Sequence, residues 1–200
     1  MSSGEAIPRD KALKVYNEFM KILDNPKGKI VKRYEYAGSL RRRKKEVHDI
    51  EIVAIPKFEE LQSTLDYFDD HDKKHVITVN KLHGKMEQLL AEGIINTDRP
   101  RNDRKRNPFG DRYYRINFVT EEGVYPIDLF AVLPPADYNV ILLIRTGSAE
   151  FSKWFVQQGQ PYGISVKDGH LEKDRKPIYT YSEMDVFDKM HVEYCFPSER

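Results

Sequence analysis

Three acidic side chains in apolar surroundings are the residues of this chain best suited to chemistry. Asp49 and Glu51 stand two positions apart in a β-branched run, so on a strand both side chains would leave the same face. Asp128 lies in a second apolar run, residues 125–130. Neighbouring carboxylates repel each other unless cations neutralise them, and a pair of hard divalent ions is the usual answer. The same alternation is also typical of acids that face solvent on one side of an open sheet.

The residues before this acid pair indicate a substrate that carries phosphate. Gly38 and Ser39 are predicted to form a loop after a strand, where backbone N–H groups and a hydroxyl can receive phosphate oxygens. Arg41 and Arg42 come next, and guanidinium groups can bind phosphate in a bidentate way. The order Gly-Ser-x-Arg-Arg, six residues, then Asp-x-acid on a strand therefore predicts one site for a metal-bridged triphosphate.

In these motifs and their order, the chain resembles the DNA polymerase X family, the polymerase beta-like nucleotidyltransferases. The resemblance covers most of residues 12–200 and extends to small polymerase beta-like proteins of bacteria and phages. Its motifs are Gly38-Ser39-Leu40-Arg41-Arg42 through Asp49-Ile50-Glu51 (nucleotide-binding signature), Ile127-Asp128-Leu129 (strand of the third carboxylate), Thr146-Gly147-Ser148 followed by Phe151 (nucleotide-pocket turn and helix), and residues 182–200 (C-terminal ending).

The resemblance implies a DNA polymerase that transfers a nucleotide from a dNTP to a primer 3′-hydroxyl, in gap filling or repair. It implies two Mg²⁺ ions, with Mn²⁺ as an alternative, and Asp49, Glu51 and Asp128 as catalytic metal ligands. The nucleotide-binding residues would be Gly38, Ser39, Arg42, His48, Arg145, Thr146 and Gly147.

The chain departs from the family pattern near these residues. Glu51 stands where the family usually has Asp, and the extra methylene moves the carboxylate outward by roughly 1.5 Å. His48 replaces a frequent Gly, and Ile144-Arg145 replaces an aromatic pair. We therefore expect a more crowded phosphate approach and a shifted metal geometry that favours Mn²⁺.

Composition excludes several other classes of protein. The 200 residues carry 33 Lys and Arg against 32 Asp and Glu, a net charge of +1, which excludes a basic tail or a highly charged disordered chain. The single cysteine, Cys195, excludes a disulfide framework. No stretch approaches the ~18 apolar residues of a membrane span, and the N-terminus lacks an apolar signal core. We expect a cytoplasmic monomer with no membrane partner.

Basic residues gather locally despite the balanced total. One run is 41–45, and a second cluster spans 99–115, where cations alternate with aromatic residues. Such a mixture suits backbone neutralisation and base stacking, although a solvated insertion would have the same composition. The predicted partner is primer/template or gapped DNA. The predicted DNA contacts are Arg101, Arg104, Lys105, Arg106, Arg112 and Lys153.

Periodicity and turn signals predict an α+β fold. We expect residues 1–140 to form a nucleotidyltransferase palm, a mixed sheet flanked by helices, with 57–112 as an insertion that carries the basic loop. Residues 141–200 would form a smaller subdomain that packs on the nascent base pair. The predicted helices are 8–24, 80–92, 148–158 and 182–190, with Ser148 and Ser182 as candidate N-caps. The predicted strands are 34–37, 48–55, 113–119, 124–132, 140–144 and short strands within 162–181, with a hairpin turn at 120–123.

Two other functions remain open on the sequence. The chain could be a nucleotidyltransferase whose acceptor is RNA, a protein or a small molecule. It could also bind nucleic acid without catalysing a reaction.

Overall fold

The computed structural model describes residues 5–24, 28–63, 75–98 and 109–200. The helices are α1 (Arg9–Leu23), α2 (Gly38–Arg41), α3 (Lys81–Ala91), α4 (Tyr138–Thr146), α5 (Ala149–Gln158) and α6 (Glu183–Lys189). The strands are β1 (Ile7–Pro8), β2 (Val31–Tyr36), β3 (Glu46–Val47), β4 (Ile50–Pro56), β5 (Phe58–Ser63), β6 (His75–Asn80), β7 (Ile95–Asn96), β8 (Phe109–Gly110), β9 (Tyr113–Thr120), β10 (Gly123–Ala131), β11 (Ile164–Lys167), β12 (His170–Lys173) and β13 (Lys176–Ile178).

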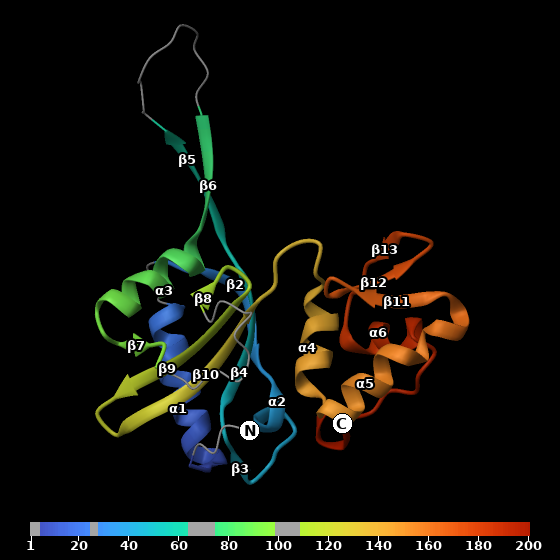
Figure 1. Cartoon of the computed structure of the whole chain (residues 1–200), viewed down its shortest axis with the longest axis horizontal. Helices are drawn as coiled ribbons and strands as arrows, with labels where there is room; N and C mark the ends of the chain where they lie inside the picture. Colours follow the sequence, from blue (N-terminus) through green and yellow to red (C-terminus); the bar gives the residue numbers. More distant parts are fainter. Residues whose placement is uncertain (1–4, 25–27, 64–74, 99–108) are drawn as a thin grey trace, which may run out of the picture.

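A mixed sheet with the strand order β2-β4-β10-β9-β7 forms the centre of the molecule (Figure 1). β10 runs parallel to β4, whereas β2 is antiparallel to β4 and β9 is antiparallel to β10. The hairpin β9–β10 turns at residues 120–123, where the sequence predicts it. The α+β class is therefore confirmed.

Helices α1 and α3 cover one face of this sheet. The buried face of α1 repeats at helical spacing, and its Phe19 packs edge-on against Phe118 of β9. Ile50 and Ile52 of β4 and Leu129 of β10 are fully buried in the same core. Apolar alternation thus sends every second residue of the central strands toward the helices and leaves the intervening residues for the opposite face.

The opposite face of the sheet packs against α4, which corrects one prediction. The sequence predicts a strand over 140–144, but these residues lie within α4. The Asp137 side chain accepts a hydrogen bond from the Asn139 N–H and so begins the helix. Leu142 packs with the sheet residues Val53 and Phe130, whereas Val140 and Leu143 belong to a second core. A short apolar run has no distinguishing period, and here the N-cap decided in favour of the helix.

That second core holds together the C-terminal elements, which lie to the right of the sheet in Figure 1. α5 and α6 pack there against the three-stranded sheet β11-β12-β13. Ser148 and Ser182 cap α5 and α6 by accepting hydrogen bonds from the N–H groups of Phe151 and Asp185. Both caps and both helices are as the sequence predicts.

β5 and β6 pair with each other in a hairpin that projects away from the central sheet (Figure 1). This hairpin and α3 fall within the predicted insertion 57–112, and so does β7, which joins the central sheet. Among the described residues, no helix is long and apolar enough to cross a membrane.

Candidate active site

The three candidate acids come together where β4 and β10 run side by side. Glu51 of β4 and Asp128 of β10 are directly paired in the parallel ladder, and Arg115 of β9 is paired with Asp128 on its other side. Paired residues project from the same face of a sheet. Asp49 lies in the bend that precedes β4 rather than within the strand. The structure therefore arranges Asp49, Glu51, Asp128 and Arg115 along one edge of the face that looks toward α4.

Backbone geometry at Gly38 shapes the surroundings of Glu51. Gly38 has a φ of +57°, and a Cβ added to it would lie 1.8 Å from Glu51 Oε2. The carboxylate thus rests directly on the glycine, in space that any other residue would fill. The Gly38-Ser39 segment is predicted as a loop, but it forms the short helix α2.

The electrostatics of Glu51 reflect this crowding. Burial raises its pKa, the nearby charges of Asp49 and Asp128 raise it further, and the value reaches about 7. Arg145 and Arg42 act in the opposite direction and lower the pKa. Near neutral pH, Glu51 is therefore divided between its protonated and ionised forms, and additional positive charge nearby would favour the ionised form.

Arg41, the last residue of α2, and Arg42, which follows it, both reach Thr146 at the end of α4. Arg42 donates from Nη1 to the Thr146 carbonyl at 2.6 Å, and its Nε is buried without a hydrogen-bond partner among the described residues. Arg41 donates to the Thr146 hydroxyl at 2.9 Å and forms a two-point ion pair with Glu183 of α6. Of the two arginines considered for phosphate, Arg41 is thus already paired, whereas Arg42 retains a free donor.

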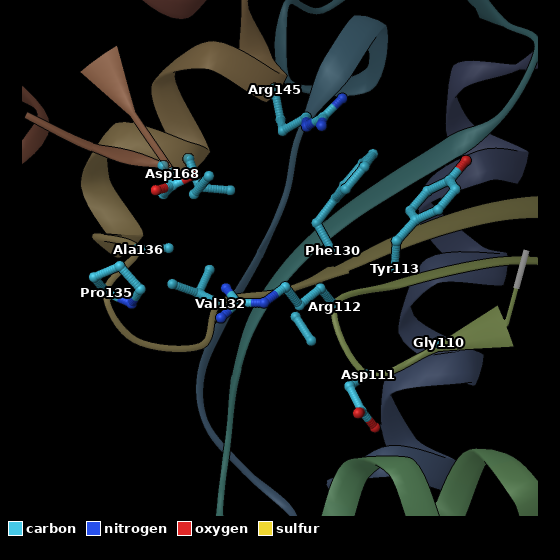
Figure 2. A pocket seen from close by; sticks show the side chains of 13 residues that line it. Gly110, Asp111, Arg112, Tyr113, Phe130, Val132, Pro135, Ala136, Arg145 and Asp168 are labelled. Carbon is cyan, nitrogen blue, oxygen red and sulfur yellow. The ribbon is translucent and has the colours of Figure 1, made fainter. Parts of the chain in front are cut away.

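Arg145 lies over an aromatic pair beside the acids. Its guanidinium carbon is 3.9 Å from the centroid of the Phe130 ring, which stacks on the ring of Tyr113 at 5.0 Å. Phe130 follows Asp128 by two positions, so both project from the same face. A pocket of about 1020 Å³ opens beside this stack, between the ends of β9 and β10, α4 and the β11–β12 turn (Figure 2).

The other predicted site residues differ in their surroundings. Ser39 is half-buried in α2, His48 is exposed in the bend before Asp49, and Lys153 is exposed on α5. Gly147 ends α4, and a Cβ there would lie 2.5 Å from Phe151 Cδ1, so the glycine permits close packing of α5. Arg112 lines the pocket and donates to the carbonyls of Leu133 and Pro134. The predicted DNA contacts Arg101, Arg104, Lys105 and Arg106 lie outside the described residues.

Within the described ranges, no three His, Cys, Asp or Glu side chains converge in a geometry ready to hold a metal ion. The carboxylate of Glu51, one of the candidate ligands, rests against Gly38 of α2. The donor set still fits a divalent cation. Carboxylate oxygens are the ligands that Mg²⁺ and Mn²⁺ accept, and such a cation would offset the charges of Asp49 and Asp128 that raise the pKa of Glu51.

Two features of the site escape sequence reasoning. Glu183 pairs with both Arg41 and Arg200, although these residues are far apart in the chain. Arg115 stands beside Asp128 because of the β9–β10 register, which the hairpin signal alone leaves unspecified. A prediction of the strand register from the turn at 120–123 could have placed Arg115 beside Asp128.

Comparison with known proteins adds no name to this site: no protein-family model matches the chain, and no curated protein matches it.

Proposed function

We propose that the chain is a metal-dependent nucleotidyltransferase that adds nucleotides from dNTPs to the 3′-hydroxyl of a DNA primer, in gaps or during repair. The mixed sheet would be the palm of such an enzyme, and the elements from α4 onward the subdomain that faces the nascent base pair. The observation that carries this proposal is the adjacency of Glu51 and Asp128 on parallel strands, with Asp49 just before them. This adjacency joins two motifs that are 77 positions apart in the sequence.

The cations around the acids support an anionic donor substrate. Arg42 is held by the Thr146 carbonyl and keeps an unpaired, buried Nε, which suits a phosphate oxygen. Arg145 is near enough to lower the pKa of Glu51. A triphosphate between these side chains would receive charge-assisted hydrogen bonds from Arg42, and metal ions held by the three acids would offset the remaining negative charge.

In this proposal, Asp49, Glu51 and Asp128 hold two divalent ions. When bound, such ions stabilise the charge that develops on the transferred phosphoryl group and activate the attacking hydroxyl. The residues themselves position these ions, and the apolar side chains on the other face of β4 and β10 fix the two strands. The raised pKa of Glu51 predicts that ion binding also releases a proton.

A second acceptor class has one observation in its favour. The pocket beside Phe130 and Tyr113 is large enough for a small molecule, and Arg145, which lines it, is near enough to Glu51 to lower the pKa of that acid. A nucleotidyltransferase that modifies a small hydroxyl compound could use this pocket as its acceptor site.

An extension assay tests the proposal and separates these acceptors. Gapped DNA, single-stranded DNA and RNA would each be incubated with every dNTP and NTP, in Mg²⁺ or Mn²⁺. We expect metal-dependent extension of gapped DNA with the dNTP that the template specifies. Asp128→Asn should abolish it, whereas Asp188→Asn, which changes an exposed acid on α6, should not.

The other outcomes have distinct meanings. Extension of single strands regardless of template contradicts templated synthesis. Exclusive transfer to RNA or to a small hydroxyl compound favours the second acceptor class. Failure to transfer to any acceptor with either ion, by a folded protein that binds nucleic acid, contradicts an enzymatic function.

A further inference from the structure

Two arginines flank the candidate acids from opposite sides. Arg42 approaches from the side of β2 and α2, next to Glu51. Arg115 lies on β9, on the far side of Asp128. Neighbouring strands are about 4.8 Å apart, so the backbone of Arg115 is about one strand spacing from Asp128 and two from Glu51. Across the sheet, the acids Glu51 and Asp128 therefore lie between two cations, Arg42 on one side and Arg115 on the other.

Arg115 has an unused donor in this position. Its Nε is buried and has no hydrogen-bond partner within the described part of the chain. A buried polar group without a partner carries a desolvation cost, so such groups in native structures call for an explanation. Arg42 is the other arginine of the site with a buried, unpaired Nε, and we assign it to the donor nucleotide.

A purely local role for Arg115, neutralising the acids, explains fewer of its contacts and neighbours. The arginines that lower the pKa of Glu51 are Arg145 and Arg42. Arg115 also has an aromatic neighbour on the same face of β9, the half-buried Tyr113. A cation next to an aromatic ring, beside acids that would hold catalytic metals, is the composition of a surface that binds a nucleic-acid strand.

We infer that Arg115 binds the last internucleotide phosphate of the acceptor strand. This inference rests on the proposed nucleotidyl transfer and adds a substrate requirement: the acceptor must carry a phosphodiester one nucleotide before its reactive 3′-hydroxyl. In-line transfer needs the attacking 3′-hydroxyl and the leaving pyrophosphate on opposite sides of the transferred phosphorus. Arg42 and Arg115 lie on opposite sides of the acids, which suits a donor on the side of Arg42 and an acceptor on the side of Arg115. Asp128, the acid next to Arg115, would be the one nearest the acceptor hydroxyl.

The test measures binding without transfer. Fluorescence anisotropy would report the affinity of the whole chain for gapped DNA in the absence of dNTP, with either a natural or a neutral methylphosphonate linkage before the primer 3′-terminal nucleotide. We expect the neutral linkage to weaken binding to the unsubstituted protein about tenfold, the range for a hydrogen bond to a charged group. Arg115→Met should weaken binding of natural DNA by a similar factor and lower the salt slope by about one. The neutral linkage should then have no further effect on Arg115→Met.

Matched controls keep this result specific. Arg175→Met removes an exposed arginine at the β12–β13 turn, and a methylphosphonate several linkages upstream removes a different charge; both should leave the terminal effect intact. Arg115→Lys should restore part of the affinity. Where transfer is measurable, Arg115→Met should raise the acceptor KM and leave kcat and the dNTP KM nearly unchanged.

Three results would overturn the inference. The unsubstituted protein could bind DNA with the terminal methylphosphonate as tightly as natural DNA, or it could fail to bind gapped DNA. The neutral linkage could also weaken binding to Arg115→Met as much as it weakens binding to the unsubstituted protein. Because the binding assay contains no dNTP, it decides the role of Arg115 even if the chain transfers nothing. Absence of transfer together with coupled losses would contradict the proposed function but retain the phosphate site.

Discussion

Glu183 provides the most quantitative prediction, since it links the sheet region to the C-terminal elements. Its carboxylate accepts hydrogen bonds from Arg41 at 2.8 and 2.5 Å and from Arg200 at 2.7 Å. The side chain of Glu183 is 12% exposed and that of Arg200 is 0% exposed. Glu183→Ala leaves two guanidinium groups close together with no carboxylate between them. Removal of one partner from a buried ion pair costs about 3–5 kcal/mol in the free energy of unfolding.

Thermal and urea unfolding followed by circular dichroism would measure this loss. For a chain of this length, the expected fall in Tm is roughly 6–20 °C, at about 2–4 °C per kcal/mol. Glu183→Gln keeps one acceptor oxygen and should lose less. Glu59→Ala is the matched control, because the Glu59–Lys81 pair is exposed and should contribute less than about 1 kcal/mol. A Glu183→Ala variant within about 1 kcal/mol of the unsubstituted protein would refute the buried network as a source of stability.

Four further predictions follow from the same contacts. Gly38→Ala should abolish nucleotide transfer with the fold retained, because its Cβ would meet Glu51 Oε2 at 1.8 Å; unchanged kcat would contradict this packing. Asp128→Asn should lower the pKa of Glu51, measured by carboxyl NMR, from its value of about 7. An unchanged pKa of Glu51 would exclude an electrostatic interaction between Asp128 and Glu51. Mg²⁺ should raise the Tm of the unsubstituted protein more than that of Asp128→Asn, and equal shifts would indicate ion binding elsewhere. Burial raises the pKa of Glu183, but the hydrogen bonds from Arg41 and Arg200 lower it more, so the pKa lies below its ordinary value of 4.5. The free energy of unfolding should therefore be constant above pH 4.5 and fall as the pH drops below 4.5. The fall should be shallower in Glu183→Gln, and identical profiles would contradict this assignment.

Much of the fold is predictable because its signals are local. The serine caps at 148 and 182 and the helical spacing of α1 each involve residues within a few positions of one another. The β9–β10 hairpin likewise depends on a short turn between two alternating runs. Alternation also predicts correctly that Ile50 and Ile52 enter the core while Glu51 does not.

The remainder depends on tertiary contacts that a single sequence does not specify. The strand predicted over 140–144 is wrong, because its apolar run fits either period and the decisive cap, Asp137, lies just outside it. Gly38-Ser39 is helical rather than looped, since the turn packs against Glu51. Arg41 and Glu183 are 142 positions apart in the sequence, and no local pattern around either residue predicts that they pair.

The parallel pairing of β4 with β10 also determines when the acids can meet during synthesis. Parallel neighbours need a crossover, and here it takes 77 positions to bring Asp128 beside Glu51. Until β10 has left the ribosome, β4 offers an unpaired apolar edge on a chain that already contains α1 and β2. Topologies with such distant contacts fold slowly, and the nascent chain is then exposed to wrong pairings. We therefore expect chaperone dependence to be greatest for nascent chains from which β4 has emerged but β10 has not, and to diminish once residue 131 has left the ribosome.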